Sequence, residues 1–122
     1  MRHQRGNKKL NRPFDQRLAL LRGQVSLLFL HGHVTTTKAR AEQVKRLAEK
    51  LIAHAMSGTL HGTREVMKVL YTRDVYYALK HKVAPACHAK DKGGYLKEYK
   101  VGYRRGDGAL LVKLAVPDFP VE

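Results

Sequence analysis

The fold is decided by the stretch PFDQRLALLRGQVSLLFLHG, residues 13–32, because its apolar residues form one helical stripe. They recur at steps of three and four and therefore share one face of a helix: Phe14, Leu18, Leu21, Val25 and Leu28. Four further apolar residues widen this face: Leu20, Leu27, Phe29 and Leu30. We expect a helix that ends near residue 31, buries this face and lies at the centre of the fold.

Capping signals flank this helix on both sides. Asn11 or Arg12 occupies the predicted cap position, and Pro13 suits the first turn because its missing N–H would be unpaired there. At the other end, Gly32 supplies the left-handed residue with which many helices end.

Three more helices follow a short β-branched segment. The segment Val34–Thr37 predicts a short strand, and Thr36 or Thr37 caps a helix over residues 38–56. The predicted inner face of that helix consists of Val44, Leu47, Ala48, Leu51, Ile52 and Ala55. Thr59 caps a third helix, whose apolar set is Val66, Met67, Val69 and Leu70. Thr72 caps a fourth helix that runs to about Lys82, before a stop at Pro85.

The last part of the chain predicts a β-hairpin over residues 95–116, after a loop at residues 88–94. Alternation in the first strand places five side chains on one side: Tyr95, Lys97, Tyr99, Val101 and Tyr103. The sequence Arg-Gly-Asp-Gly at residues 105–108 forms the turn. The second strand presents Leu110, Val112, Leu114 and Val116 on one face.

The resulting order is helix, short strand, three helices and β-hairpin. This order predicts an α+β fold, a two-layer single domain with the helices on one face of a small sheet. A length of 122 residues also fits one domain. We divide the chain into an extended basic N-terminal arm, residues 1–12, and an α+β body, residues 13–122.

The charge balance points to a polyanionic partner. The chain has 24 Lys and Arg against 10 Asp and Glu, a net charge of +14 that repels itself in a small domain. Nucleic acid is the first candidate partner, and an anionic membrane surface is the second. One cysteine excludes an intrachain disulfide, no apolar run is long enough for a membrane span, and no secretory signal is recognised, so we expect a cytoplasmic protein.

The positive charge is spread along the chain, and the N-terminal arm, MRHQRGNKKLNR, is an acid-free part of it. It holds five Lys or Arg, one His and no acid, so it has too little apolar surface to fold alone. Arginine suits bidentate phosphate contacts, and the sharpest candidates are Arg2, Arg5, Arg12, Arg17, Arg22, Arg104 and Arg105. His3 is placed to donate to a phosphate or to stack on a base.

Other chemistries find little support. Tyr95, Tyr99 and Tyr103 could stack on bases, but we favour a role in covering the core edge. His31, His33 and the Cys87-His88 pair lack a second pair at ligand spacing, so no metal site or cofactor is expected. No nucleophile motif or phosphate loop occurs, and we expect no enzymatic activity. Arg-Gly-Asp at residues 105–107 matches an adhesion motif, which we interpret as turn chemistry.

Several short segments form a recognisable series along the chain: Met1-Arg2-His3, Lys9-Leu10-Asn11-Arg12, Arg17, Val34–Thr37 with Arg40-Ala41, Gly93-Gly94-Tyr95 and residues 104–109 (Arg-Arg-Gly-Asp-Gly-Ala). Together they resemble the bacterial large-subunit ribosomal protein 17 family. They keep the family's order over essentially the whole chain. Glu42 stands where the family usually has a base, Gln16 replaces a common His, and the Pro13–Asp15 entry to the first helix differs.

The resemblance implies a non-catalytic component of the large ribosomal subunit that binds its rRNA and supports subunit assembly and translation. It also implies neighbouring ribosomal proteins such as numbers 22 and 32. With the charge pattern, it predicts these rRNA-binding residues: Arg2, His3, Arg5, Lys8, Lys9, Arg12, Arg17, Arg22, Lys38, Arg40, Arg104 and Arg105. The alternatives are a free nucleoid-type basic DNA-binding protein and, less favoured, a small basic nuclease.

Overall fold

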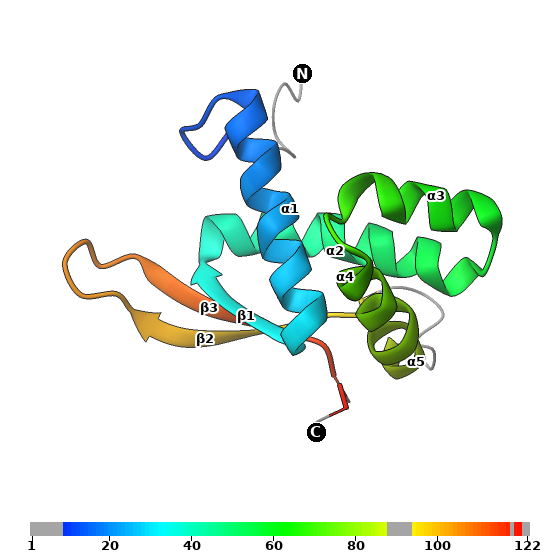
Figure 1. Cartoon of the computed structure of the whole chain (residues 1–122). Helices are drawn as coiled ribbons and strands as arrows, with labels where there is room; N and C mark the ends of the chain where they lie inside the picture. The colour runs from blue at the N-terminus through cyan, green and yellow to red at the C-terminus, as the bar shows by residue number, and fades with distance from the viewer. Residues whose placement is uncertain (1–8, 88–93, 118, 121–122) are drawn as a thin grey trace, which may run out of the picture.

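A computed structural model describes residues 9–87, 94–117 and 119–120 and confirms the α+β class (Figure 1). The helices and strands, in chain order, are α1 (Phe14–His31), β1 (His33–Thr37), α2 (Lys38–Ser57), α3 (Leu60–Val69), α4 (Arg73–Ala78), the π-helical turn η1 (Leu79–Val83), α5 (Ala84–Cys87), β2 (Lys97–Tyr103) and β3 (Leu110–Ala115). Of the predicted loop at residues 88–94, all but Gly94 lies outside the described residues. No helix in the described part of the chain is both long and apolar enough to cross a membrane.

Helix α1 ends as the sequence predicts but starts later. Gly32 has φ 81°, and its N–H donates to the carbonyl of Leu28 at 2.8 Å. The start was predicted wrongly: Pro13 is the cap residue, in place of Asn11 or Arg12, and no side chain caps the helix. The carbonyl of Pro13 accepts the first helical hydrogen bond.

The apolar stripe of α1 is buried only in its second half. Val25, Leu28 and Phe29 are fully buried, whereas Phe14 is 65% exposed and Leu18 is 42% exposed. Leu27 and Leu30, two of the residues predicted to widen the face, are also exposed. Figure 1 shows that the first half of α1 projects beyond the sheet and α2, so neither of these described elements covers its apolar side.

The sheet has three antiparallel strands in the order β1-β3-β2. The hairpin and the strand between α1 and α2 are therefore confirmed, and they lie next to each other. Val112 and Leu114 of β3 are fully buried beneath α1 and α2, which pack against this inner face of the sheet. The helices and the sheet form two layers with the core between them.

Helix α2 contributes the predicted inner face to this core. Val44, Ala48, Leu51 and Ile52 are buried, and Leu47 and Ala55 pack against them. Helix α3 lies against the end of α2, where a side-chain carbon on Gly62 would be 2.5 Å from the carbonyl oxygen of His54. The predicted caps of α3 and α4 are confirmed: Thr59 accepts from the N–H of Gly62, and Thr72 accepts from that of Val75. Met67, predicted to be buried, is 42% exposed.

The predicted stop at Pro85 is wrong, because helix continues through it. Helix α4 passes into η1 and then into α5, which contains Pro85. The N–H of Ala84 donates to the carbonyl of Leu79, five residues earlier. A proline ring in a regular helix clashes with the carbonyl four residues before it. We attribute the wider π-helical turn to this ring, which needs the extra room.

A β-bulge in β2 changes which tyrosines share a face. Lys100 pairs with Val112 and Gly102 pairs with Leu111, so Val101 is an extra residue in the strand. Tyr99 and Tyr103, predicted to lie on one side of the strand, therefore point to opposite faces. Tyr95 is buried as expected, but Tyr99 is 52% exposed and Tyr103 is 78% exposed.

Candidate nucleic-acid interface

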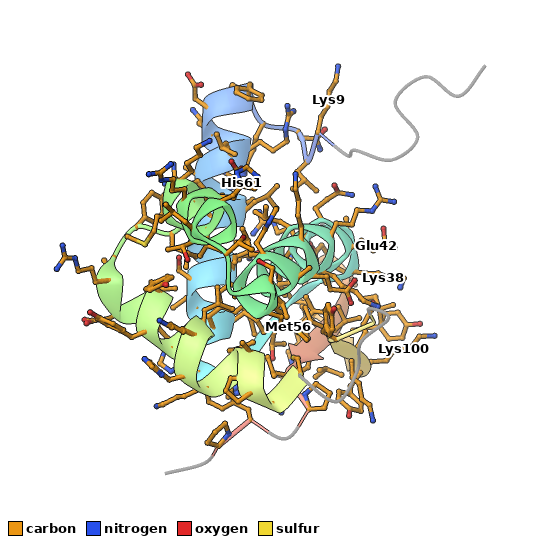
Figure 2. All side chains as sticks on the ribbon, turned by 90° about the vertical axis from the view of Figure 1, so that its right-hand side faces the viewer. Lys9, Lys38, Glu42, Met56, His61 and Lys100 are labelled. Atoms are coloured by element: carbon orange, nitrogen blue, oxygen red, sulfur yellow. The ribbon has the colours of Figure 1, made fainter. Side chains whose placement is uncertain are left out.

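Seven of the eight predicted basic residues that the structure describes lie at three places: around the start of α1, at the start of α2 and at the hairpin turn. The eighth, Arg22, lies in the middle of α1 and faces the junction between α3 and α4. In Figure 1 the three places lie along the left and upper side of the molecule, whereas α3 and α4 occupy the right-hand side. Figure 2 places Lys9 at the end of the molecule away from the sheet. Arg2, His3, Arg5 and Lys8 lie outside the described residues.

A tight turn precedes α1 and contains two of the predicted bases, Lys9 and Arg12. The backbone N–H of Arg12 donates to the carbonyl of Lys9 at 3.1 Å. Between them, Leu10 and Asn11 have φ values of 56° and 55°. Leucine rarely adopts this left-handed conformation, which costs about 1–2 kcal/mol. The turn therefore sets the direction in which the chain enters the helix.

The first two arginines of α1 differ in their surroundings. The guanidinium of Arg17 lies 5.5 Å from the centre of the exposed Phe14 ring, near the start of the helix. Arg22 donates its Nε–H to the carbonyl of Val69 at 2.6 Å and lies 4.3 Å from the Tyr71 ring centre. Arg22 thus ties α1 to the junction between α3 and α4, a structural role that the sequence analysis missed.

The start of α2 carries one paired and one unpaired base. Lys38 contacts Glu98 of β2 at 3.0 Å and Glu42 at 3.7 Å, and Figure 2 shows Lys38 beside Glu42. Hydrogen bonding to Glu98 holds the pKa of Lys38 above its usual value. Arg40 is half-buried and has no ion pair or side-chain hydrogen bond among the described residues. Arg40 is therefore the readier of the two to meet a phosphate.

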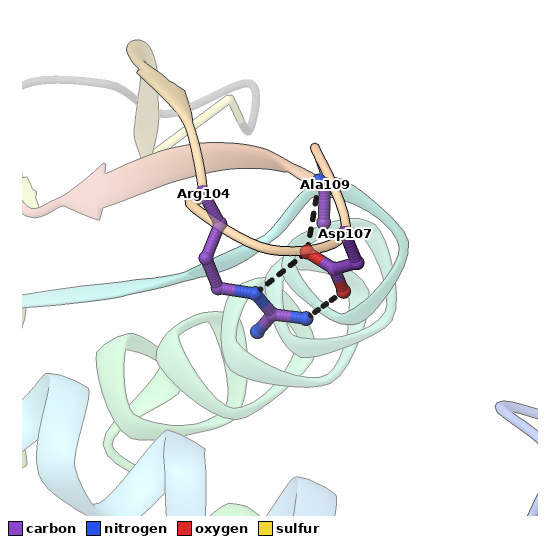
Figure 3. Close-up of polar contacts among 3 residues, drawn as sticks. All are labelled: Arg104, Asp107 and Ala109. Atoms are coloured by element: carbon purple, nitrogen blue, oxygen red, sulfur yellow. Dashed lines mark hydrogen bonds and ion pairs between the residues drawn. The ribbon is translucent and has the colours of Figure 1, made fainter.

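The hairpin turn also carries one base that is paired with a carboxylate and one that is not, Arg104 and Arg105; Figure 3 shows the paired one. Arg104 donates Nε–H to Oδ1 of Asp107 at 3.1 Å and a second N–H to Oδ2, and Oδ1 also accepts the backbone N–H of Ala109 at 3.2 Å. These bonds, that from Arg104 first, lower the pKa of Asp107 to about 2 and raise that of Arg104. Asp107 is thus used by the turn, which supports the interpretation of Arg-Gly-Asp as turn chemistry. Arg105 is exposed and forms no ion pair with another described residue.

The described residues provide no metal centre. No group of three or more His, Cys, Asp or Glu side chains within them is arranged to hold an ion. His31 and His33 are exposed at the turn between α1 and β1, Cys87 is buried, and His88 lies outside the described residues.

One set of basic and aromatic residues was missed because it only comes together in the sheet. His33, Lys97, Tyr99 and Lys113 belong to three different strands, and the strand register places all four on the face opposite the helices. The alternation of β3 contains a signal for one of them: with Val112 and Leu114 facing the core, Lys113 must face away.

Comparison with known proteins adds a family match. The family model for ribosomal protein L17 matches residues 20–115 of the chain. The "Large ribosomal subunit protein bL17" of Clostridium perfringens is 45% identical over 109 residues, which cover 89% of this chain and 96% of that protein. The protein of the same name from Clostridium botulinum is 44% identical over the same shares.

Proposed function

Because the chain belongs to the ribosomal protein L17 family, we propose that it binds large-subunit rRNA and helps to assemble and hold the large ribosomal subunit. Its role is structural and not catalytic. It works on the ribosome in the bacterial cytoplasm and contributes to translation. Ribosomal proteins 22 and 32 are its proposed protein neighbours, as the family resemblance implies.

The observation that carries this proposal is the placement of charge. Within a net charge of +14, the arm at residues 1–12 carries five bases and no acid, and further bases lie at three points along one side of the body. A polyanion that crosses this side would neutralise all of them at once. Each phosphate contact releases condensed counterions, which drives binding largely independently of sequence.

The unpaired arginines are the first candidates for phosphate contact. Arg12, Arg40 and Arg105 have side chains without an ion pair or hydrogen bond among the described residues, and Arg17 contacts only an exposed ring. Guanidinium groups in this state can offer a full fork of donors to a phosphate.

The paired bases contribute less. Lys38 and Arg104 each form an ion pair with a carboxylate, and Arg22 already donates one hydrogen bond to the carbonyl of Val69. Within the arm, we assign phosphate contacts to Arg2, His3, Arg5, Lys8 and Lys9, which would thread between RNA helices. Recognition would be mostly of RNA shape, because double-stranded RNA hides its base edges in a deep, narrow groove.

Co-sedimentation tests this function directly. An epitope-tagged copy of the full chain, expressed in its own host, should migrate with large subunits through a sucrose gradient at high salt. A charge-matched basic protein of unrelated fold, expressed with the same tag, should be left at the top. If the tagged chain also stays at the top, the proposed function is wrong.

A further inference from the structure

The sheet has a second face that no described helix covers. Helices α1 and α2 pack on the inner face, and Figure 1 shows the opposite face open below them. We call this opposite face the outer sheet face. It carries Thr35 of β1, Lys113 of β3 and Tyr99 of β2, together with the strand residues whose side chains lie on the same side of the sheet as these three.

The strand register aligns the outer sheet face in rows. Tyr99, Lys113 and Thr35 form one row across the three strands. Lys97, Ala115 and His33 form the next row, two residues further along. The strand residues described here place no acidic side chain on this face, because Glu98 points to the other side and binds Lys38. The face is therefore basic and carries an exposed aromatic ring.

A hollow of about 270 Å³ opens at one end of this face. Its lining includes His31, His33, Lys113, Ala115 and Phe119. Ala115 lies between Lys97 and His33 in its row, and its short side chain leaves the hollow unfilled. Phe119 forms a wall: its ring lies on Gly32, where an added side-chain carbon would be 2.5 Å from it.

The two lysines of the outer sheet face form no ion pair with the residues that the structure describes. In this respect Lys97 and Lys113 differ from Lys38 and Lys68, which do form ion pairs. Two unpaired ammonium groups beside an exposed tyrosine and an aromatic-walled hollow fit a ligand that offers both negative charge and flat rings.

We infer that the outer sheet face binds a short unpaired segment of RNA. One base stacks on Tyr99, and a base further along enters the hollow against Phe119. Lys97 and Lys113 neutralise the phosphates between them, and His33 can donate to the same backbone. Unpaired RNA suits this face better than a duplex, because only unpaired bases can present their flat sides to an aromatic ring. The inference rests on the proposed function, which makes RNA the polyanion.

The test measures binding of the full chain to a short fluorescein-labelled oligouridine by fluorescence anisotropy. Tyr99→Ala removes the stacking ring, and Ala115→Leu fills the hollow without a change of charge. Each should weaken binding by about fivefold or more, since one base–aromatic stack contributes on the order of 1 kcal/mol or more. The unfolding temperature of each variant is measured alongside, so that a folding defect is detected.

The bulge in β2 supplies matched controls. Tyr103→Ala removes an exposed tyrosine from the same strand but from the opposite face, and it should change oligouridine affinity by less than about twofold. Lys100→Ala is the control for Lys113→Ala: each removes one positive charge, and only Lys113 lies on the outer sheet face. Equal losses for Tyr99→Ala and Tyr103→Ala, with both folded, would overturn the inference.

A second readout locates the RNA without relying on affinity. Irradiation of the full chain with an oligomer of 5-bromouridine should crosslink Tyr99 or Phe119, and Ala115→Leu should abolish the crosslink to Phe119. Crosslinks confined to residues 1–12 would contradict the inference. If the chain co-sediments with large subunits while these sheet-face results fail, the proposed function stands and only this inference falls.

Discussion

Removing two unpaired arginines should reduce the salt dependence of RNA binding more than removing two paired bases next to them. The double variant Arg40→Ala/Arg105→Ala takes one unpaired base from the start of α2 and one from the hairpin turn. The matched variant Lys38→Ala/Arg104→Ala takes one paired base from each of the same two segments. Both lower the net charge by the same amount and act at the same two segments, so the comparison tests whether pairing with a carboxylate decides the contribution of a base.

The expected size follows from the contacts. Each phosphate contact contributes roughly 0.7–0.9 to the slope of log affinity against log salt concentration. Losing Arg40 and Arg105 should therefore lower that slope by about 1.4–1.8. Lys38 lies 3.0 Å from Glu98 and Arg104 forms two hydrogen bonds with Asp107, so both already have a counter-charge. Their loss should lower the slope by less than about 0.7.

The assay is filter binding of purified large-subunit rRNA over a series of potassium chloride concentrations. The slope is the deciding quantity, because both variants lose affinity at any single salt concentration. If the two double variants lower the slope equally, or if the paired variant lowers it more, then side-chain pairing within the protein does not determine which bases meet phosphate, and the reasoning is refuted.

Three further predictions concern the turns and the arm. Gly32→Ala should lower the free energy of unfolding by about 2–4 kcal/mol, because both the left-handed conformation and the overlap with Phe119 oppose a side chain there. Gly58→Ala should lower it by about 1 kcal/mol, from the conformation alone. Equal losses for the two variants in urea unfolding would contradict this. The carboxyl of Asp107 should titrate near pH 2 by NMR, and its pKa should move towards the ordinary value of 3.8 in Arg104→Ala. Because the fold lowers this pKa, the contribution of the Arg104–Asp107 pair to stability is present above about pH 3.8 and is lost as the pH falls through about 2; an unchanged midpoint in the variant would exclude the pair. Deleting residues 2–12 should weaken rRNA binding and flatten its salt dependence but leave the unfolding temperature of the free protein almost unchanged; a large drop in that temperature would show that the arm stabilises the body.

Local patterns were enough to predict most of the helices and strands. The β-branched run at residues 34–37, the caps Thr59 and Thr72, and the alternation of residues 110–116 all gave the observed elements. These signals work because caps and alternation depend on neighbours within a few positions. The same locality explains the errors: the stripe of α1 was predicted to be buried at Phe14, but burial depends on whether another element reaches that far.

Pro85 and Val101 mark the limits of local rules for the backbone. A proline usually ends a helix, but a π-helical turn just before Pro85 allows the helix to continue. Strict alternation predicts Tyr99 and Tyr103 on one face of the sheet, but the extra residue Val101 places them on opposite faces. Pro85 and Gly102 are the sequence features beside these two irregularities, but neither residue alone determines whether the helix stops or widens, or whether the strand continues or bulges.

The sequence locates the basic segments of the candidate interface but not the pairing of their side chains. That these segments contact RNA stays a prediction. Charge counting could not show that Lys38 meets Glu98, 60 residues away, or that Arg22 meets Val69, 47 residues away. Long-range contacts of this kind decide which bases remain free, and they arise only when the sheet and helices are assembled.

The most direct test of the central claim is a cryo-EM map of the large ribosomal subunit that contains this chain. We expect the guanidinium groups of Arg12, Arg40 and Arg105 to lie within hydrogen-bonding distance, about 3 Å, of rRNA phosphate oxygens. We also expect Arg104 to remain paired with Asp107. A map in which these three arginines face solvent or protein while α3 and α4 face the RNA would show that the proposed interface is wrong.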